Sequence, residues 1–543
     1  MVFARRSTTL LAAIIASCAM VLSLTACTSD NKTVVDGQTT VTSNSAGGVA
    51  VFTPSDGITL NQQTPLNKWA KLVPDLAKAL ADAGFKKGDI DHTTSDSLAK
   101  QSRAIQDFVV DHLSNNTTDD SGIAIAPDNM TLLVAPVVEA DASTRQYGDY
   151  ISQNLSTNDA TDGEATSDGE SSEDDSSKDD SSNTESDSTA SDEQAQAVDR
   201  LVSSLKLAKE SGMHVVLLGN SIEGYKPDAF VKFSDAQTIG KLQAEKMVSK
   251  LKLDKASKDN PKYIEVLLPY TAVDEKGNAN DSTFAQEAFR GIWQVLGSYY
   301  QRGVVESPSG TLDGKSTEND WQAVAYDAAK EGSTAKVLDK RLAKTDGQST
   351  LTRIDGIITM NDYIASEVVK ELDDLGYTGS AADINPQITI SGIVGNITGK
   401  KDLSRDAVPD PIKSPENDNA NDSSSSDDDA DKDTSASDKD RDSQWPLVTG
   451  YGAYVSNIPS IVNGKQWMTG MEDRQTIATD IAQACAKLNK DEALNSMPSI
   501  RNSEVGGVKK IPTISEPLLA VSASNLKSAL IDPGYISLAD AGL

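Results

Sequence analysis

Short apolar runs alternate with amphipathic helical segments along most of this chain. The apolar runs are continuous rather than alternating with polar residues, as in residues 213–220 (MHVVLLGN) and 354–362 (IDGIITMND). Strands of this kind are typical of parallel sheets whose two faces are both covered by helices. The pattern therefore predicts an α/β fold built from doubly wound parallel sheets.

The expected elements follow in a regular order. The patterns predict strands at 121–127, 213–220, 262–270, 354–362, 386–393 and 445–449. They predict helices at 69–85, 97–113, 196–212, 235–253, 284–297, 321–332 and 363–377.

Two acidic low-complexity segments interrupt this alternation. The chain has 543 residues and a net charge of −31, of which residues 159–193 carry −13 and residues 414–444 carry −8. Neither segment has the apolar residues needed for a core, so both are expected to be disordered. Specific cation binding is the alternative, although dense Asp without fixed geometry binds calcium weakly. The acidity also argues against nucleic-acid partners.

The N-terminus has the features of an export signal. Arg5 and Arg6 precede an apolar run, residues 10–24, which is short for a stable membrane span. The run ends in Leu-Thr-Ala-Cys27, which resembles the lipobox of bacterial lipoproteins. That resemblance implies cleavage after residue 26, lipidation of Cys27 and anchoring on the extracytoplasmic face of the membrane. An ordinary cleaved signal and an uncleaved anchor are the alternatives.

Residues that would support catalysis or cofactor binding are scarce. The three histidines form no metal-spaced pair, and there is no nucleophile elbow, phosphate loop or Cys-x-x-Cys motif. Cys485 has no partner for a disulfide and lies at helical spacing, which is typical of a core position. We therefore expect a protein that is not an enzyme and that uses no cofactor or metal.

Polar and aromatic side chains follow several of the predicted strands. Doubly wound sheets bind ligands at the carboxyl ends of their strands. Aromatic faces combined with amides and carboxylates suit a polyhydroxylated ligand such as a sugar. At a helix start the same residues can act merely as caps. The candidates are Asn220, Asp235, Asn280, Asn361, Asp362 and Tyr451, with Trp69 at the start of the first helix.

Taken in order, these segments resemble the periplasmic-binding-protein type 1 family. The similarity is to solute-binding lipoproteins of ribose, xylose and multiple-sugar ABC importers. It covers nearly all of the chain after the signal, and residues 354–376 (IDGIITMNDYIASEVVKELDDLG) are the strongest single match. The other matching segments are NKWAKLVPDLAKALADAG, AKESGMHVVLLGN, FSDAQTIGKLQAE, NDSTFAQEAFRGIWQVL, VTGYGAYVSNIPSIVNGKQWMT and SNLKSALIDPGYISLADAG.

The resemblance implies two lobes joined by three crossings, with the solute between them. It places the signal at 1–26 and a flexible tether at 27–56. Lobe 1 is then expected at 57–232 and 473–505, with an acidic insertion near 155–195. Lobe 2 is expected at 233–472 and 506–543, with an acidic insertion near 400–444. The partners implied are the solute, the membrane subunits of an ABC importer and the membrane itself, with the protein a monomer.

The family's solute-binding positions map onto this sequence one at a time. Trp69 matches the stacking aromatic residue, and Asn361 and Asp362 match an Asn-Asp pair whose Asp accepts hydrogen bonds from hydroxyl groups. Asp235 matches the Asp near the first crossing. Glu472 falls where the crossing counted third in the family supplies a polar ligand; along this chain that crossing, at 472–473, is the second. Asn280 lies in a segment that often presents Asn. Two positions depart from the family. Gly219 and Asn220 stand where the family has Asp-Arg, and Gly452 stands where it has Asp.

Two interpretations follow for the function. The first is a lipid-anchored protein that captures a small polar solute, with a sugar as the expected class, and delivers it to an ABC importer. The alternative is a lipoprotein with the same fold that works as a sensor or an envelope interaction module without transport. An intact space between the lobes would favour the first, and a space filled by the protein's own side chains would favour the second. An enzyme is disfavoured, and so is a DNA-binding repressor, since a helix-turn-helix is missing.

Overall fold

The computed structural model describes most of the chain. The described residues are 34–35, 38–39, 46–56, 65–115, 129–138, 144–156, 184–273, 279–343, 351–381 and 445–543. The chain divides into two units, residues 1–45 and 46–543. In the first unit, strands β1 (Val34–Val35) and β2 (Gln38–Thr39) form an antiparallel pair. The fold and the candidate site belong to the second unit.

Lobe 1 is built on a seven-stranded sheet. Its strand order is β17-β18-β9-β7-β5-β3-β4, and all neighbours are parallel except the hairpin β17–β18. The strands are β3 (Gly48–Pro54), β4 (Ile90–Ser95), β5 (Met130–Val134), β7 (His214–Leu218), β9 (Ala229–Lys232), β17 (Ile500–Val505) and β18 (Val508–Ser515).

Lobe 2 is built on a six-stranded sheet with the order β12-β10-β14-β15-β16-β19. The strands are parallel except for the antiparallel pair β16–β19 at one edge. They are β10 (Lys262–Val266), β12 (Val305–Glu306), β14 (Gly356–Ile358), β15 (Leu447–Tyr451), β16 (Met468–Met471) and β19 (Leu519–Ser522).

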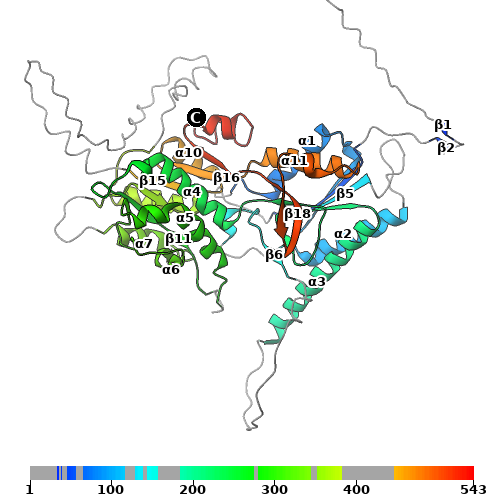
Figure 1. Cartoon of the computed structure of the whole chain (residues 1–543), viewed down its shortest axis with the longest axis horizontal. Coiled ribbons are helices and arrows are strands. Elements are labelled where there is room, and N and C mark those ends of the chain that lie inside the picture. Colours follow the sequence, from blue (N-terminus) through cyan, green and yellow to red (C-terminus); the bar gives the residue numbers. More distant parts are fainter. Residues whose placement is uncertain are drawn as a thin grey trace, which may run out of the picture. The chain divides into compact units, whose positions relative to one another are not determined.

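Helices cover both faces of each sheet (Figure 1). In lobe 1, α1 (Trp69–Asp82) packs with α11 (Arg474–Leu488) on one face, and α2 (Leu98–Asn115) packs with α3 (Thr184–Glu210) on the other. In lobe 2, α4 (Ala236–Leu251) packs with α5 (Thr283–Gln301), and α7 (Ser333–Arg341) packs with α8 (Asp362–Asp374). The predicted fold class, two doubly wound lobes, is confirmed.

Successive residues of the buried strands serve the two faces in turn. In β3, Val49 and Val51 join the cluster beneath α1 and α11, whereas Ala50 and Phe52 join the cluster beneath α2 and α3. This alternation is the period of two expected of a strand. Because both faces are buried, both sets are apolar, which explains the continuous apolar runs in the sequence.

The chain crosses between the two sheets three times. The crossings lie at residues 233–235, after β9, at 472–473, after β16, and at 516–518, between β18 and β19. The first two boundaries were expected at 232–233 and 472–473. The third was expected at 505–506, which was wrong, since β18 pairs with β9 and keeps the chain in lobe 1 up to Ser515. Alternating residues in a hairpin give a weaker signal than a buried parallel strand, so this boundary was missed.

Two further expectations were wrong. The tether was expected to extend to residue 56, but β3 lies inside the lobe 1 sheet, paired with both β4 and β5. Its short apolar run, VAVF, was hidden by the Ser-, Thr- and Gly-rich sequence before it. The helix expected at 321–332 is only α6 (Trp321–Val324), followed directly by β13 (Ala325–Tyr326), which pairs with β11 (Leu268–Pro269).

Several predictions fall partly or wholly outside the described residues. These are the signal, Cys27, the strands at 121–127 and 386–393, residues 159–183 of the first acidic segment, and the whole second acidic segment, 414–444. At the end of the first acidic segment the structure differs from the expectation, since α3 already begins at Thr184. Among the described residues, no helix is both long enough and apolar enough to span a membrane.

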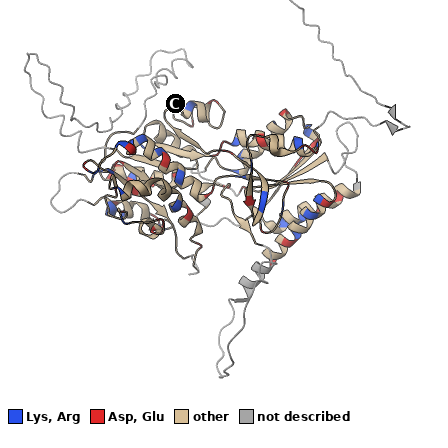
Figure 2. Cartoon of the chain, viewed as in Figure 1, with Lys and Arg blue, Asp and Glu red and all other residues tan. Residues whose placement is uncertain are grey.

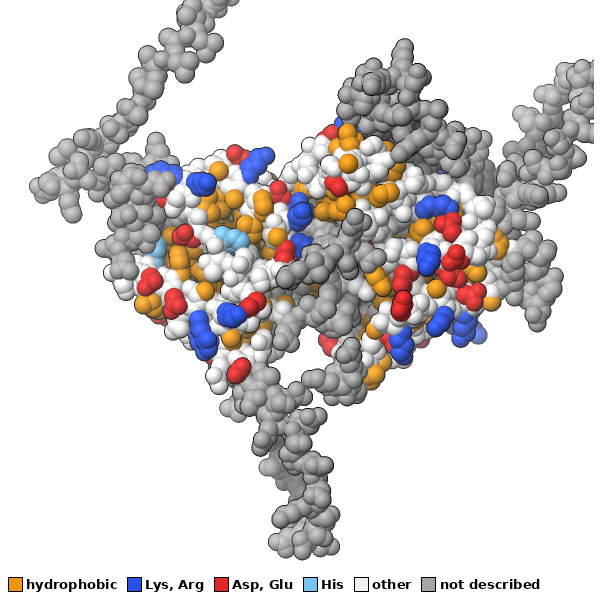
Figure 3. All heavy atoms as spheres, turned by 180° about the vertical axis from the view of Figure 1, so that it is seen from behind, with side chains coloured by type: hydrophobic (Ala, Val, Ile, Leu, Met, Phe, Trp, Pro, Cys, Tyr) orange, Lys and Arg blue, Asp and Glu red, His pale blue; other side chains and the backbone are white. Residues whose placement is uncertain are grey.

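Charged residues of both signs lie along the outer helices, as Figure 2 shows for α2 and α3. Seen from the other side in Figure 3, the described basic and acidic side chains are interspersed, with apolar side chains between them. Interspersed charges of both signs are typical of a solvated surface.

Candidate functional site

The carboxyl ends of the two parallel sheets meet near the first two crossings. The backbone N–H of Ser234, in the first crossing, donates a 2.6 Å hydrogen bond to the carboxylate of Glu472, in the second. We call the surrounding set of side chains the interlobe site. It comprises Trp69, Gln146 and Tyr147 of lobe 1, Asn361 and Tyr451 of lobe 2, and Glu472.

Asn361 is the N-cap of α8 and lies three residues after the end of β14. Its Oδ1 accepts from the backbone N–H of Ile364 over 2.9 Å, which leaves its Nδ2 free to donate elsewhere. That group donates to the side-chain oxygen of Gln146, in lobe 1, over 3.1 Å. Asn361 is therefore both a cap, as its position predicts, and a residue that reaches the other lobe.

Asp362 lies deeper than the sequence suggests. It is fully buried, and its carboxylate accepts hydrogen bonds from the Gln466 side chain (2.7 Å), the Thr469 hydroxyl (2.8 Å) and the backbone N–H of Tyr454 (2.9 Å). Burial raises the pKa of Asp362 to about 6, although these three donors oppose the rise. The resemblance implied a carboxylate that accepts from solute hydroxyls, but in this structure its partners are protein groups.

Tyr451 and Glu472 form a second buried polar group. The hydroxyls of Tyr451 and Ser234 share a hydrogen bond of 2.5 Å, and the Tyr451 hydroxyl lies 3.5 Å from the Glu472 carboxylate. Burial raises the pKa of Glu472 to about 7, against the hydrogen bonds from Ser234 and Tyr451. The Glu472 carboxylate thus joins the second crossing to the first through its hydrogen bond from the Ser234 N–H.

Trp69 is part of the lobe 1 core. It is 3% exposed and makes edge contacts with the rings of Tyr150 (5.1 Å) and Phe233 (5.6 Å). Its backbone N–H donates to Asp149 over 3.1 Å. The aromatic residue that the resemblance assigned to stacking on a solute therefore makes edge contacts with rings of the protein itself.

The other three predicted residues are also hydrogen-bonded to groups of the protein. Asn220 accepts from the Gln153 N–H and donates to the Pro136 carbonyl, both over 2.9 Å. Asp235 caps α4, because its carboxylate accepts from the Thr238 N–H over 2.7 Å. Burial alone would raise the pKa of Asp235, but hydrogen bonds from Lys232 and Thr238 outweigh burial, so the pKa lies below its usual value. Asn280 donates to the Thr271 carbonyl over 2.8 Å, within one loop. These contacts match the capping and turn roles of such residues.

The sequence reading missed the lobe 1 residues that complete the site. Gln146 and Tyr147 lie in a one-turn helix, Arg145–Tyr147, within a connection that has no periodic pattern. The Tyr454 hydroxyl, from lobe 2, donates to the Gln146 carbonyl over 2.6 Å. The Tyr147 ring lies 4.7 Å from Phe284 and 6.2 Å from Tyr451, both in lobe 2. The only sequence signal is the clustering of polar and aromatic residues in RQYGDY.

The two glycines that depart from the family lie against this packing. A side chain at Gly219 would begin 3.5 Å from the rings of Trp69 and Phe233, and Gly219 has a φ of +72°. A side chain at Gly452 would begin 2.9 Å from the Tyr454 ring, with φ +115°. Both backbones lie in the region that glycine favours, so an Asp at either position would be strained.

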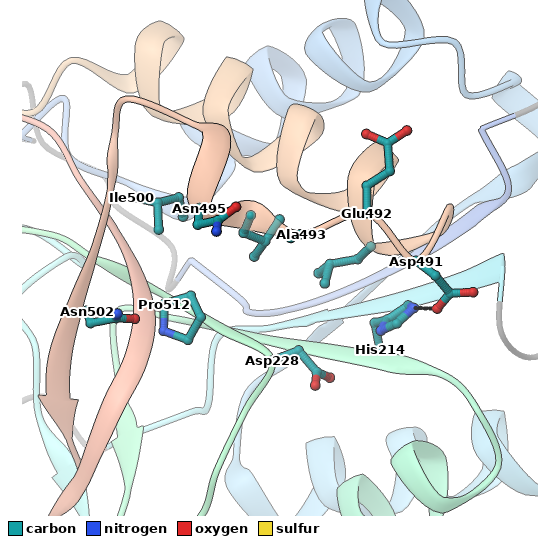
Figure 4. Close-up of a pocket in the computed structure, with 11 residues that line it drawn as sticks. His214, Asp228, Asp491, Glu492, Ala493, Asn495, Ile500, Asn502 and Pro512 are labelled. Atoms are coloured by element: carbon teal, nitrogen blue, oxygen red, sulfur yellow. Dashed lines mark ion pairs between the residues drawn. The ribbon is translucent and has the colours of Figure 1, made fainter.

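A cavity of about 540 Å³ lies elsewhere, in lobe 1 (Figure 4). It is lined in part by His214 at the start of β7 and by Asp228 just before β9, so it lies at the amino ends of the strands. His214 and Asp491 form a 3.9 Å ion pair there when the histidine is protonated. Ligands of doubly wound sheets bind at the opposite edge, so this cavity is not the predicted site. The described residues contain no cluster of three or more side chains that could hold a metal ion.

Comparisons with known proteins give distant structural likenesses only. No protein family model matches the chain, and no curated protein matches it. A solute-binding protein of an ABC transporter from Clostridium phytofermentans, solved with β-D-glucose, has 16% identity and a TM-score of 0.44, covering 91% of this chain and 99% of that one. A carbohydrate transporter solute-binding protein from Chloroflexus aurantiacus, in complex with D-glucose, has 18% identity and a TM-score of 0.42, covering 92% and 98%.

An arabinose-binding protein from Geobacillus stearothermophilus has 10% identity and a TM-score of 0.42, covering 89% of this chain and 99% of that one. Likeness at these values does not assign the chain to a family. The two-lobed α/β fold is established by the chain's own sheet order and register, and function has to be argued from the site.

Proposed function

We propose that the chain is an extracytoplasmic solute-binding protein that captures a small polar solute, with a sugar as the expected class, between its lobes for an ABC importer. The observation that carries the proposal is the convergence of amide, phenol and carboxylate groups at the carboxyl ends of both sheets. Asn361, Tyr451 and Glu472 lie there, joined by Gln146 of lobe 1. Three crossings between the lobes permit them to open and close around a solute.

The lipid anchor is the second part of the proposal. Leu-Thr-Ala-Cys27 ends the apolar run at the N-terminus, and the polar residues after it suit a tether. Labelling cells with a radioactive fatty acid should mark the wild-type protein but not Cys27→Ala. Equal labelling of both proteins would refute lipidation at this residue.

A thermal-shift screen of the purified protein against mono- and oligosaccharides tests solute binding. A ligand at 100 times its Kd stabilises the native state by roughly 2.7 kcal/mol, which raises the melting temperature measurably. Calorimetry then measures the affinity of the best sugar for Asn361→Asp, which keeps the cap acceptor and removes the donor. We expect a loss of about 1–3 kcal/mol in binding free energy.

The matched control is Asn489→Asp, because Asn489 is also buried and also donates through Nδ2, to the carbonyls of Ala46 and Gly48 (3.0 Å each). Those partners lie at the amino end of β3, away from the interlobe site. Equal affinity in wild type and Asn361→Asp would contradict the assignment of Asn361. A cell lacking the protein should also lose uptake of the sugar that binds.

The packing of the site favours a second candidate, a sensor or envelope interaction module without transport. The predicted ligand groups Trp69 and Asp362 are buried and have protein partners, and Tyr147 of the chain itself lies between Phe284 and Tyr451. If no sugar in the screen raises the melting temperature, and uptake is unchanged in the deletion strain, this second function is the better account.

A further inference from the structure

Residues 144–150 run between the two lobes, and we call them the strap. Tyr147, at the centre of the strap, is 1% exposed even though it lies in a connection rather than in a sheet or a long helix. Connections normally lie on the surface, so a buried tyrosine within one needs a specific explanation. The explanation is in the partners on each side.

On the lobe 2 side, the strap contacts residues predicted to bind the solute. The Gln146 side chain accepts from Asn361 (3.1 Å), and its carbonyl accepts from Tyr454 (2.6 Å). The Tyr147 ring packs between Phe284 and Tyr451. An amide and a ring with a polar edge thus occupy the positions where a sugar would present a hydroxyl and a ring face.

On the lobe 1 side, the strap is held firmly. The Asp149 carboxylate accepts from the Lys68 ammonium (2.7 Å), and the Tyr150 hydroxyl donates to the Lys68 carbonyl (2.6 Å). The Tyr150 ring stacks on Phe233 at 4.7 Å.

Gly148, with φ +96°, lets the strap pass so close to Asn67 that an added Cβ would lie 2.5 Å from the Asn67 carbonyl oxygen. These contacts fix the strap to lobe 1 and aim Gln146 and Tyr147 at lobe 2.

The positions next to the strap match this occupancy. At Gly452, where the resemblance implies an Asp, an added Cβ would lie 2.9 Å from the Tyr454 ring, so the missing side chain leaves room for Tyr454. The Asn67 side chain is fully buried, yet its Nδ2 has no hydrogen-bond partner among the described residues. A buried donor without a partner destabilises the folded chain, so it is a group that a solute hydroxyl would satisfy.

We propose that Gln146 and Tyr147 are the resident occupants of the interlobe site, and that a solute reaches Asn361 and Tyr451 only by displacing them. The displacement step rests on the proposed function, whereas the occupancy does not. Strap contacts to both lobes also hold the lobes together without a solute. The strap therefore lowers the apparent affinity for solute by the fraction of molecules in which it is seated.

The test compares wild type with Gln146→Ala/Tyr147→Ala. Spin labels at the exposed positions Lys206 (lobe 1) and Asp374 (lobe 2), each replaced by Cys, report the distribution of interlobe distances without a sugar. The same proteins are then screened against sugars. The matched control is Gln153→Ala/Tyr225→Ala, which removes the same two types of side chain from lobe 1. Gln153 bonds Asn220 through its backbone, which the substitution keeps. Tyr225 packs in the cluster beneath α2 and α3. Gln146→Ala alone serves if the double variant does not fold.

The expected result is a wider distance distribution in the strap variant and not in the control, with an affinity for the selected sugar at least about tenfold higher than wild type. Unchanged distances together with unchanged affinity would overturn the proposal, even if the sugar binds. Wider distances with no sugar bound by either protein would support strap occupancy and refute the proposed solute instead. The two failures are therefore distinguishable.

Discussion

The side-chain amide of Asn361 donates a hydrogen bond over 3.1 Å to the side-chain oxygen of Gln146, which lies in the other lobe. Asn361 is fixed by its role as the N-cap of α8, and Gln146 is fixed by the strap. The bond thus joins two rigid parts of the fold directly across the interlobe site. It explains why a residue predicted to hold a solute can be fully satisfied without one.

Gly450→Ala should destabilise the protein through Asp362. An added Cβ would lie 2.2 Å from the Asp362 carboxylate and 2.8 Å from the Gln466 amide, so the buried network would have to move. Overpacking of this kind costs about 1–3 kcal/mol. Urea unfolding measures the loss. Gly314→Ala is the control, because its Cβ would meet the Tyr300 carbonyl at an ordinary 3.4 Å; equal losses in the two variants would refute the argument.

Glu472 should make the protein more stable at pH 5 than at pH 8. Burial raises its pKa from 4.5 to about 7 in the folded chain, so between those values the native state holds a proton that the unfolded chain releases. The free energy of unfolding then falls as pH rises through that window, by on the order of 2 kcal/mol between pH 5 and pH 8. Glu472→Gln removes the ionisable carboxylate, so the free energy of unfolding of the variant should depend less on pH than that of the wild type. An unchanged slope in the variant would rule the group out.

Trp69→Ala should act on stability before it acts on binding. The indole is buried with Tyr150 and Phe233, and truncating a buried aromatic residue costs about 3–5 kcal/mol. Lys71→Ala, at an exposed position on the same helix, should change the free energy of unfolding by less than about 0.5 kcal/mol. If Trp69→Ala and the wild type unfold at the same midpoint concentration of urea, the Trp69 ring contributes nothing to the core.

Arg341 should be essential to the stability of lobe 2, because its positive charge balances that of a buried carboxylate. Its guanidinium lies 3.4 Å from Glu265, which is fully buried, and it also donates to the Val324 carbonyl over 2.9 Å. Arg341→Met leaves that carboxylate without its cation and should cost about 3–5 kcal/mol. Adding Glu265→Gln should restore part of the loss. Lys330→Met, which breaks an exposed 3.1 Å pair with Asp327, should cost less than about 1 kcal/mol.

The fold was largely predictable because buried parallel strands leave a strong local signal. The apolar runs at 213–220 and 354–362 predicted β7 and β14, and the amphipathic patterns at 69–85 and 363–377 predicted α1 and α8. Strand β3 was lost because its short apolar run adjoins a polar, glycine-containing stretch. The hairpin β17–β18 was lost because it alternates with exposed residues, and the third crossing was misplaced with it.

The site was only half predictable for a different reason. Asn361 and Glu472 follow strands and Tyr451 is the last residue of one, so the topology alone brings them to one edge of the sheet. Gln146 and Tyr147 reach them from a connection without periodicity, and no local pattern reports a contact 215 residues away along the chain. Whether a strand-end carboxylate such as Asp362 faces a solute or the core depends on partners like Gln466 and Thr469, which only the folded structure brings to it.

The measurement that tests the account most directly is a crystal structure of the protein with the sugar that raises its melting temperature most. The account predicts the sugar between the lobes, in contact with Asn361 and Tyr451, with Gln146 and Tyr147 moved away from both. A sugar bound elsewhere, such as in the cavity beside His214, with the hydrogen bond between Asn361 and Gln146 still in place, would contradict it.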